Sequence, residues 1–153
     1  MKLAALIAIP TVALSALALA HGGATGIVKE RMDQMVAISK AMKTMAKMVK
    51  GEIAYDAVKV RTLSREVSQM GGATLTNLFP RHSMDPPTEA RMEIWQDWGR
   101  FEQLAFDMQR TGLALSDGAE NSDGRGDAGS PFTLFGELAG TCKACHDDFR
   151  IKK

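Results

Sequence analysis

The stretch CKACH, residues 142–146, lies within the C-terminal sequence GTCKACHDDFRIKK, residues 140–153. It places Cys142, Cys145 and His146 at positions i, i+3 and i+4. In an α-helix of about 3.6 residues per turn, these three positions share one face. We therefore predict a C-terminal helix over about 132–151 that presents both sulfur atoms and the imidazole on one side.

Two cysteines three residues apart, followed at once by a histidine, are typical of covalent attachment of a c-type haem. Each thiol adds to a vinyl group, and the imidazole ligates the iron. The motif predicts one covalently attached haem c, bound to Cys142 and Cys145, with His146 as the proximal iron ligand. Arg150 follows His146 by one turn and is expected beside the proximal face of the haem, although a cation also suits a helix C-terminus.

Three other interpretations of the cysteine pair are less favoured. A redox-active Cys-x-x-Cys usually opens a helix beside a parallel strand, whereas this pair closes the chain and no βαβ pattern precedes it. A closed zinc site needs four ligands, and His21 and His82 are far from the cysteines without ligand-like spacing. A disulfide between Cys142 and Cys145 within one helix would be strained.

Residues 1–20, MKLAALIAIPTVALSALALA, have the pattern of a cleaved signal peptide. The apolar run ends in Ala18-Leu19-Ala20 and is interrupted by Pro10, whereas a membrane span needs about 18 or more unbroken apolar residues. We expect a mature chain from about His21, exported to the periplasm without stable membrane insertion. Because a c-type haem is attached on that side of a bacterial membrane, the cytochrome c maturation machinery is an implied partner.

Residues 21–153, about 133 in number, suit a single domain. The full chain holds 19 basic and 18 acidic residues, and one of the basic residues, Lys2, lies in the signal sequence. The balanced charge gives no indication of a nucleic-acid partner. No paired carboxylates or activated nucleophile stand at a meaningful spacing, so we do not expect an enzyme.

The segment 26–50 predicts the first helix, which Gly51 ends. Its apolar residues recur at the spacing of a bundle helix, namely Val28, Met35, Ile38, Met42, Met45 and Val49. Arg31 lies within about 40° of Met35 on a helical wheel, so it faces the interior or its edge. A buried guanidinium needs an anion, which a haem propionate would supply, whereas an arginine at the edge would extend into solvent.

Met35, one turn beyond Arg31, is a candidate sixth ligand of the iron. Methionine is also a common core residue, so packing is the alternative interpretation. The same segment holds five methionines, and thioethers together with an N-terminal His21 suit Cu(I). Copper binding is less favoured, because three of these methionines continue the core stripe.

Two further helices are predicted over 52–79 and 88–116. The first carries apolar residues at bundle spacing: Ile53, Ala57, Val60, Val67 and Leu78. Its pair Gly71-Gly72 indicates a bend or a close approach to another helix. The second contains Trp95 and Trp98, which we predict to pack in the haem pocket or the core. The polar segment 117–131 is expected to be a loop, and we assign it no function.

Four amphipathic helices and a terminal Cys-x-x-Cys-His together resemble the class II c-type cytochromes, the cytochrome c′ family. The resemblance spans the whole mature chain and includes VKERMDQM (28–35), KGEIAYDA (50–57) and EIWQDWGRFEQ (93–103). It implies an all-α fold, an antiparallel up-down-up-down four-helix bundle. It also implies a propionate-facing role for Arg31 and allows a homodimer through the first two helices.

The position four residues after Arg31 bears on function. In gas-binding members of the family it is usually leucine or another non-ligand, whereas Met35 is similar to the methionine ligand of low-spin members. A Met/His pair favours one-electron transfer and occupies the site that a diatomic ligand would need. The resemblance thus implies a periplasmic electron carrier with Met35 and His146 as axial ligands and with unidentified redox partner proteins. The alternative is a five-coordinate cytochrome c′ that binds NO or CO.

Overall fold

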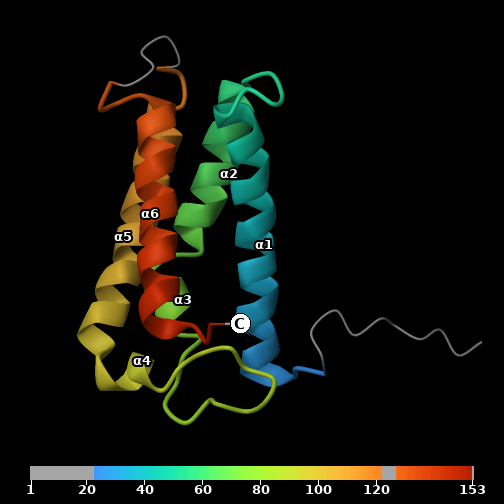
Figure 1. Ribbon diagram of the computed structural model, residues 1–153, viewed down its shortest axis with the longest axis vertical. Coiled ribbons are helices and arrows are strands. Elements are labelled where there is room, and N and C mark those ends of the chain that lie inside the picture. Colours follow the sequence, from blue (N-terminus) through green and yellow to red (C-terminus); the bar gives the residue numbers. More distant parts are fainter. Residues whose placement is uncertain (1–22, 122–126, 153) are drawn as a thin grey trace, which may run out of the picture.

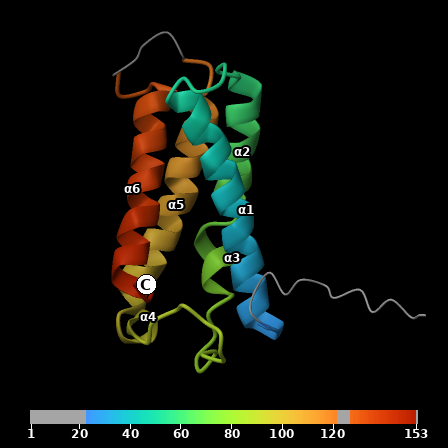
Figure 2. The ribbon, with the colours of Figure 1, turned by 45° about the vertical axis from the view of Figure 1, so that its right-hand side comes forward.

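The computed structural model describes residues 23–121 and 127–152. Its helices in chain order are α1 (Gly26–Val49), α2 (Ala57–Gln69), α3 (Gly72–Thr76), α4 (Glu93–Gln96), α5 (Trp98–Gly118) and α6 (Pro131–Phe149). The four long helices α1, α2, α5 and α6 run alternately up and down beside one another (Figure 1, Figure 2). This arrangement confirms the predicted antiparallel four-helix bundle. The predicted signal peptide, residues 1–20, lies outside the described residues.

Polar caps begin three of the long helices. The carboxylates of Asp56 and Asp97 accept hydrogen bonds from the backbone N–H groups three residues later, at 2.9 and 3.2 Å. Ser130 caps α6 in the same way, and Pro131 follows in the first turn, where its missing N–H costs nothing. Short polar sequences therefore set where α2, α5 and α6 start.

The second predicted helix, 52–79, is wrong as one continuous element. The chain breaks between α2 and α3 at the two glycines, where Gly72 has φ +55°. A Cβ atom on Gly71 would lie 2.7 Å from the backbone nitrogen of Gln109 in α5, so the pair marks both a bend and a close approach. Ile53 lies before α2 and is 42% exposed, so its predicted core position is also wrong.

The third predicted helix, 88–116, begins later than expected and is interrupted. It consists of α4 and α5, and the break falls at Asp97, whose carboxylate caps α5. Residues 89–91 are drawn into contact with the chain after α6, where Ala90 and Arg150 form an isolated antiparallel β-bridge. The last helix ends at Phe149 rather than 151, because this bridge holds Arg150 in extended conformation.

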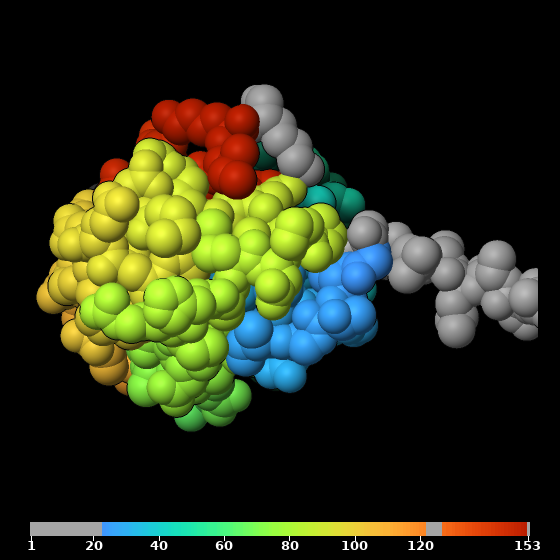
Figure 3. Space-filling view, turned by 90° about the horizontal axis from the view of Figure 1, so that it is seen from below, coloured from blue at the N-terminus to red at the C-terminus, as the bar shows by residue number. Residues whose placement is uncertain are grey.

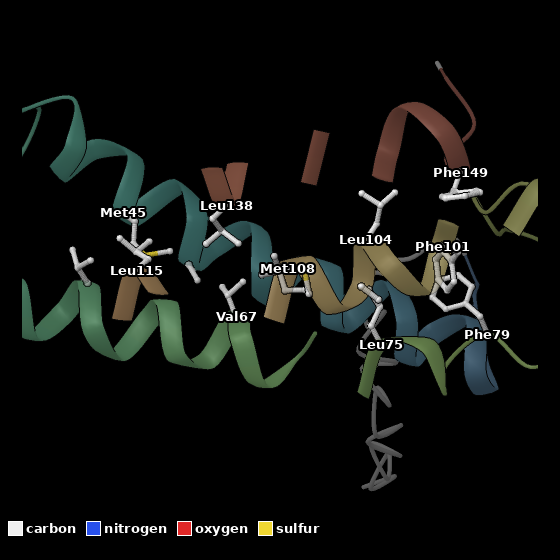
Figure 4. Packing of buried hydrophobic residues seen from close by; sticks show 14 of the residues in the cluster. Met45, Val67, Leu75, Phe79, Phe101, Leu104, Met108, Leu115, Leu138 and Phe149 are labelled. Atoms are coloured by element: carbon white, nitrogen blue, oxygen red, sulfur yellow. The ribbon is translucent and has the colours of Figure 1, made fainter. Parts of the chain in front are cut away.

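The hydrophobic core runs along the bundle axis and receives side chains from all four long helices (Figure 4). Met45, Val67, Leu115 and Leu138 come from α1, α2, α5 and α6, and each is 0% exposed. At one end of the bundle the core becomes aromatic. There the ring of Phe101 meets the ring of Phe79 edge-on, with centroids 4.8 Å apart, and that of Phe149 at 5.5 Å.

The aromatic end of the molecule is covered by the segment that joins α3 to α4. Seen from below, this yellow-green segment lies between the blue start of α1 and the red end of α6 (Figure 3). It contacts Arg31 of α1 through Ser83, and Arg150 after the end of α6 through Glu89. Across the described ranges, no helix is both long and apolar enough to cross a membrane.

Candidate functional site

The cysteines of the motif lie on the last turns of α6 as free, half-buried thiols. Cys145 packs against the hydrophobic core. Burial is the main cause that raises the pKa of Cys145 to about 11, and the neighbouring Cys142 and Asp148 add to it. Burial also raises the pKa of Cys142. Both sulfur atoms are thus held protonated in a partly apolar setting on one side of the helix, as the spacing predicts.

His146 follows Cys145 directly and is exposed overall. Its neighbours still remove enough water from the ring that desolvation is the first cause that lowers the pKa of His146, and the positive charge of Arg150 is the second. The carboxylates of Asp147 and Glu89 act in the opposite direction. The imidazole is therefore kept neutral near pH 7, which is the form that binds a metal.

Arg31 is buried near the start of α1, with 4% of its surface exposed. Its Nη2 donates a hydrogen bond to the backbone oxygen of Ser83, while Nε and Nη1 are buried without a hydrogen-bond partner. Burial lowers the pKa of Arg31, and the charge of Asp85 partly opposes this. The prediction that Arg31 faces the interior is confirmed, and its two nitrogens without a partner fit an anionic group from outside the chain.

Phe79 joins Arg31 to Trp95. The guanidinium carbon of Arg31 lies 4.6 Å from the centre of the Phe79 ring, and the indole nitrogen of Trp95 donates to the backbone oxygen of Phe79 at 3.0 Å. Beside them lies a hollow of about 400 Å³, whose lining includes Phe79, Trp95 and Trp98. The two tryptophans are partly buried against the core, as predicted, and Trp95 is fixed in place by its hydrogen bond.

Arg150 differs from the sequence prediction in its surroundings. It stands after the end of α6, and its guanidinium binds the carboxylate of Glu89 through Nε at 2.8 Å and Nη2 at 2.6 Å. Its backbone N–H still donates to the carbonyl of His146 at 3.2 Å, so Arg150 remains one turn away from the histidine. Arg150 therefore stands at the C-terminal end of α6, where a cation is expected, and it also forms an ion pair with Glu89 that the sequence did not predict.

Met35 lies one turn after Arg31 on α1, where it is half-buried and packs against the hydrophobic core. Its helix contacts α6, which carries His146. The structure thus supports the packing role that the sequence left open. Its place as a sixth iron ligand stays a prediction.

The residues present fit a covalently held haem. Two half-buried thiols and an imidazole share one helix, and a buried guanidinium near the same end of the bundle has two nitrogen donors without a partner. Cys142 and Cys145 would hold the haem edge, His146 would bind iron, and Arg31 would pair with a propionate. The haem would supply an iron centre able to exchange one electron or take a small ligand.

The sequence analysis did not identify three residues that contact Arg31 or Arg150, namely Phe79, Ser83 and Glu89. Phe79 and Ser83 contact Arg31 from 48 and 52 positions away, and Glu89 lies 61 positions before its partner Arg150. No local pattern marks such pairs.

Comparisons with known proteins agree with the fold and the motif. A family model, Cytochrome C', matches residues 26–150. Cytochrome c' from Alcaligenes xylosoxydans xylosoxydans is 34% identical over 129 residues, which cover 82% of this chain and 94% of that protein. Cytochrome c' from Cereibacter sphaeroides is 30% identical over 151 residues, covering 95% and 93%.

Solved structures give the same result. Cytochrome c' from Rhodopseudomonas palustris has a TM-score of 0.72 at 28% identity, and the match covers 85% of this chain and 99% of that one. The nitric oxide complex of a mutant cytochrome c prime from Alcaligenes xylosoxidans has a TM-score of 0.71 at 28% identity, covering 83% and 94%. All of these relatives are named cytochrome c', which favours that group over the low-spin Met/His subgroup that the sequence analysis preferred.

Proposed function

Because the chain belongs to the cytochrome c′ family, we propose that it binds nitric oxide or carbon monoxide at an open position of a five-coordinate haem iron. Like other members of the family, it carries one covalently attached c-type haem. The observation that carries the proposal is the match to a solved nitric oxide complex over 83% of the chain. The fit of the cysteines, His146 and Arg31 to a haem supports it.

In this proposal each residue of the site has a separate task. Cys142 and Cys145 hold the haem on α6, and His146 binds one side of the iron, which leaves the other side for a diatomic ligand. Met35 stays with the core as an apolar packing residue, as its half-buried position in the structure supports. While Met35 packs on the core, its side chain excludes water and its sulfur does not compete with the gas for the iron.

A second candidate function is one-electron transfer with Met35 and His146 as axial ligands. One observation favours it: Met35 lies one turn after the buried Arg31, on a helix that contacts α6. A thioether ligand would raise the reduction potential and block the position that a gas needs. This second candidate function would also require redox partner proteins that give and accept the electron.

The test is the absorption and EPR spectrum of the oxidised holoprotein, followed by CO titration of the reduced form. We expect a high-spin spectrum and complete CO binding in the wild type. Met35→Leu keeps the side-chain volume but removes the sulfur. We expect it to leave the spin state unchanged, because Met35 does not bind the iron in this proposal.

The matched control is Met42→Leu, since Met42 is also a partly buried methionine of α1 packed on the core. A low-spin wild type that turns high-spin in Met35→Leu, but not in Met42→Leu, would overturn the gas-binding proposal and establish the electron carrier. Haem staining on a denaturing gel checks the covalent attachment, because a thioether-bound haem stays with the chain.

The proposed setting is the periplasm of a bacterium. The signal-like sequence of residues 1–20 and the need for covalent haem attachment support it. The cytochrome c maturation machinery would then act on Cys142 and Cys145 after export. Fractionation of cells that express the full chain, followed by haem staining, tests this location.

A further inference from the structure

The chain just after His146 is fixed by the segment that precedes α4. Two backbone hydrogen bonds flank the Ala90–Arg150 bridge. The backbone N–H of Arg91 donates to the backbone oxygen of Phe149, and the backbone N–H of Ile151 donates to the backbone oxygen of Glu89, each at 2.9 Å. The side chain of Arg91 also donates a hydrogen bond to the backbone oxygen of Asp148, at 3.1 Å. The end of α6 is thereby tied to a part of the chain about 60 positions earlier.

The ion pair between Glu89 and Arg150 belongs to the same contact. Nε and Nη2 of Arg150 both donate to Oε2 of Glu89, at 2.8 and 2.6 Å. The side chains are 32% and 48% exposed, so the pair is partly shielded from water. Arg150 has an extended backbone after the helix end, and its side-chain direction is therefore not set by the helix. The carboxylate of Glu89 sets it.

The charges of Arg150 and Glu89 also lie near His146. Arg150 lies one turn from His146, to which its backbone is hydrogen-bonded, and Glu89 is bound to Arg150. The guanidinium of Arg150 and the carboxylate of Glu89 carry opposite charges and are in direct contact. The pair is therefore a nearly neutral unit beside the predicted iron ligand, and loss of either member would leave one charge there.

We propose that Glu89 is a positioning residue of the haem site, which fixes Arg150 beside His146 and balances its charge at the proximal ligand. The proposal rests on one part of the proposed function, namely that a haem is covalently attached and that His146 binds its iron. It does not depend on whether the sixth position of the iron is open. Failure of CO binding would thus overturn gas binding and would not alter the result expected below.

The expected effect follows from the charge of the iron. Oxidised haem carries one more positive charge than reduced haem, so an unbalanced cation nearby destabilises the oxidised form and raises the reduction potential. An unbalanced carboxylate lowers it. A purely structural role of the pair would not give shifts of opposite sign in the two single variants.

The experiment is redox titration of the holoprotein with Glu89→Gln, Arg150→Gln and the double substitution. We expect a higher potential in Glu89→Gln, a lower one in Arg150→Gln, and a return toward the wild-type value in the double variant. Both single shifts should shrink at high salt, because the pair is partly exposed. Glu89→Asp, which keeps the charge with a shorter reach, should lie between the wild type and Glu89→Gln.

The matched control is Glu120→Gln, which removes the ion pair of Glu120 with Arg61 near the opposite end of α5. It should leave the potential unchanged. Shifts of the same sign in Glu89→Gln and Arg150→Gln, or shifts no larger than in this control, would overturn the role of Glu89.

Discussion

The contact between α2 and α5 and the end of the bundle that joins α1 to α6 are built differently. Between α2 and α5 the backbones approach so closely that a Cβ on Gly112 would lie 3.0 Å from the Ser68 nitrogen, and the Ser68 hydroxyl donates to the Gln109 oxygen at 2.7 Å. At the other end, Nε and Nη1 of Arg31 are buried without a hydrogen-bond partner, and His146 is exposed. The first region is satisfied by the chain's own atoms, whereas the second leaves buried polar atoms that the chain does not satisfy.

The largest effect is expected at the incomplete end. In the holoprotein, Arg31→Met should lower the free energy of unfolding by about 3 kcal/mol, because it leaves a buried anionic partner without its cation. Urea unfolding followed by circular dichroism measures this. Arg110→Met is the control, since the Arg110 side chain is 70% exposed and its ion pair with Asp107 should contribute less than about 1 kcal/mol.

A variant that cannot attach haem tests whether the effect of Arg31→Met on the free energy of unfolding depends on the cofactor. In a Cys142→Ser/Cys145→Ser background, which cannot attach haem, Arg31→Met should be neutral or stabilise by about 1 kcal/mol, because it removes a buried charge without an anion. Equal destabilisation with and without haem would contradict an anionic partner from the cofactor.

The next effect tests the close approach of the α2–α3 connection to α5. Gly71 has φ −88°, which suits any residue, so Gly71→Ala introduces a steric clash with the Gln109 backbone rather than backbone strain. We expect a loss of about 2 kcal/mol in the free energy of unfolding. Gly136→Ala in α6 has open space around the new methyl group and should stabilise by up to about 1 kcal/mol. Similar results for both variants would mean that the α2–α3 connection can move away from α5 at no cost.

A smaller effect is expected where the α1–α2 connection meets the end of α5. The hydroxyl of Tyr55 donates to the Ala119 oxygen at 2.6 Å, and Tyr55→Phe should cost about 1 kcal/mol at pH 7. Burial and the charge of Asp56 raise the pKa of Tyr55, so the folded state holds this proton more tightly than the unfolded state. The stability from Tyr55 is thus fully present below its ordinary pKa of about 10 and is lost as the pH rises through the folded-state value.

Urea unfolding of the wild type and Tyr55→Phe between pH 7 and pH 11 measures this dependence. The difference between the two proteins should shrink above about pH 10. A difference that stays constant over the whole range would show that Tyr55 titrates alike in the folded and unfolded states.

The smallest effect is expected at Ile53, outside both regions. The sequence pattern placed it in the core stripe of a helix, but it is 42% exposed and precedes α2. Ile53→Ser should change the free energy of unfolding by less than about 0.5 kcal/mol. A loss comparable to that of a core substitution would indicate that Ile53 is covered in solution, for instance by a second copy of the chain.

The periodic parts of the bundle were predictable because their signals are local. The stripe of α1 follows the helical period, and Arg31 was correctly placed inward by the same rule. The helix breaks were not predictable to the residue. Gly71 was recognised as a bend or a close approach, but the partner Gln109 lies 38 positions away in the sequence.

Spacing within about two turns was enough to predict the amphipathic helices and the side of α6 that carries Cys142, Cys145 and His146, whereas the bundle was implied by the resemblance to the cytochrome c′ family. Neither the unpartnered Nε and Nη1 of Arg31 nor the ion pair between Glu89 and Arg150 could be predicted in this way. The physical reason is that burial and ion pairing depend on which distant segments meet. Such contacts form when the whole bundle closes, and no local pattern encodes them.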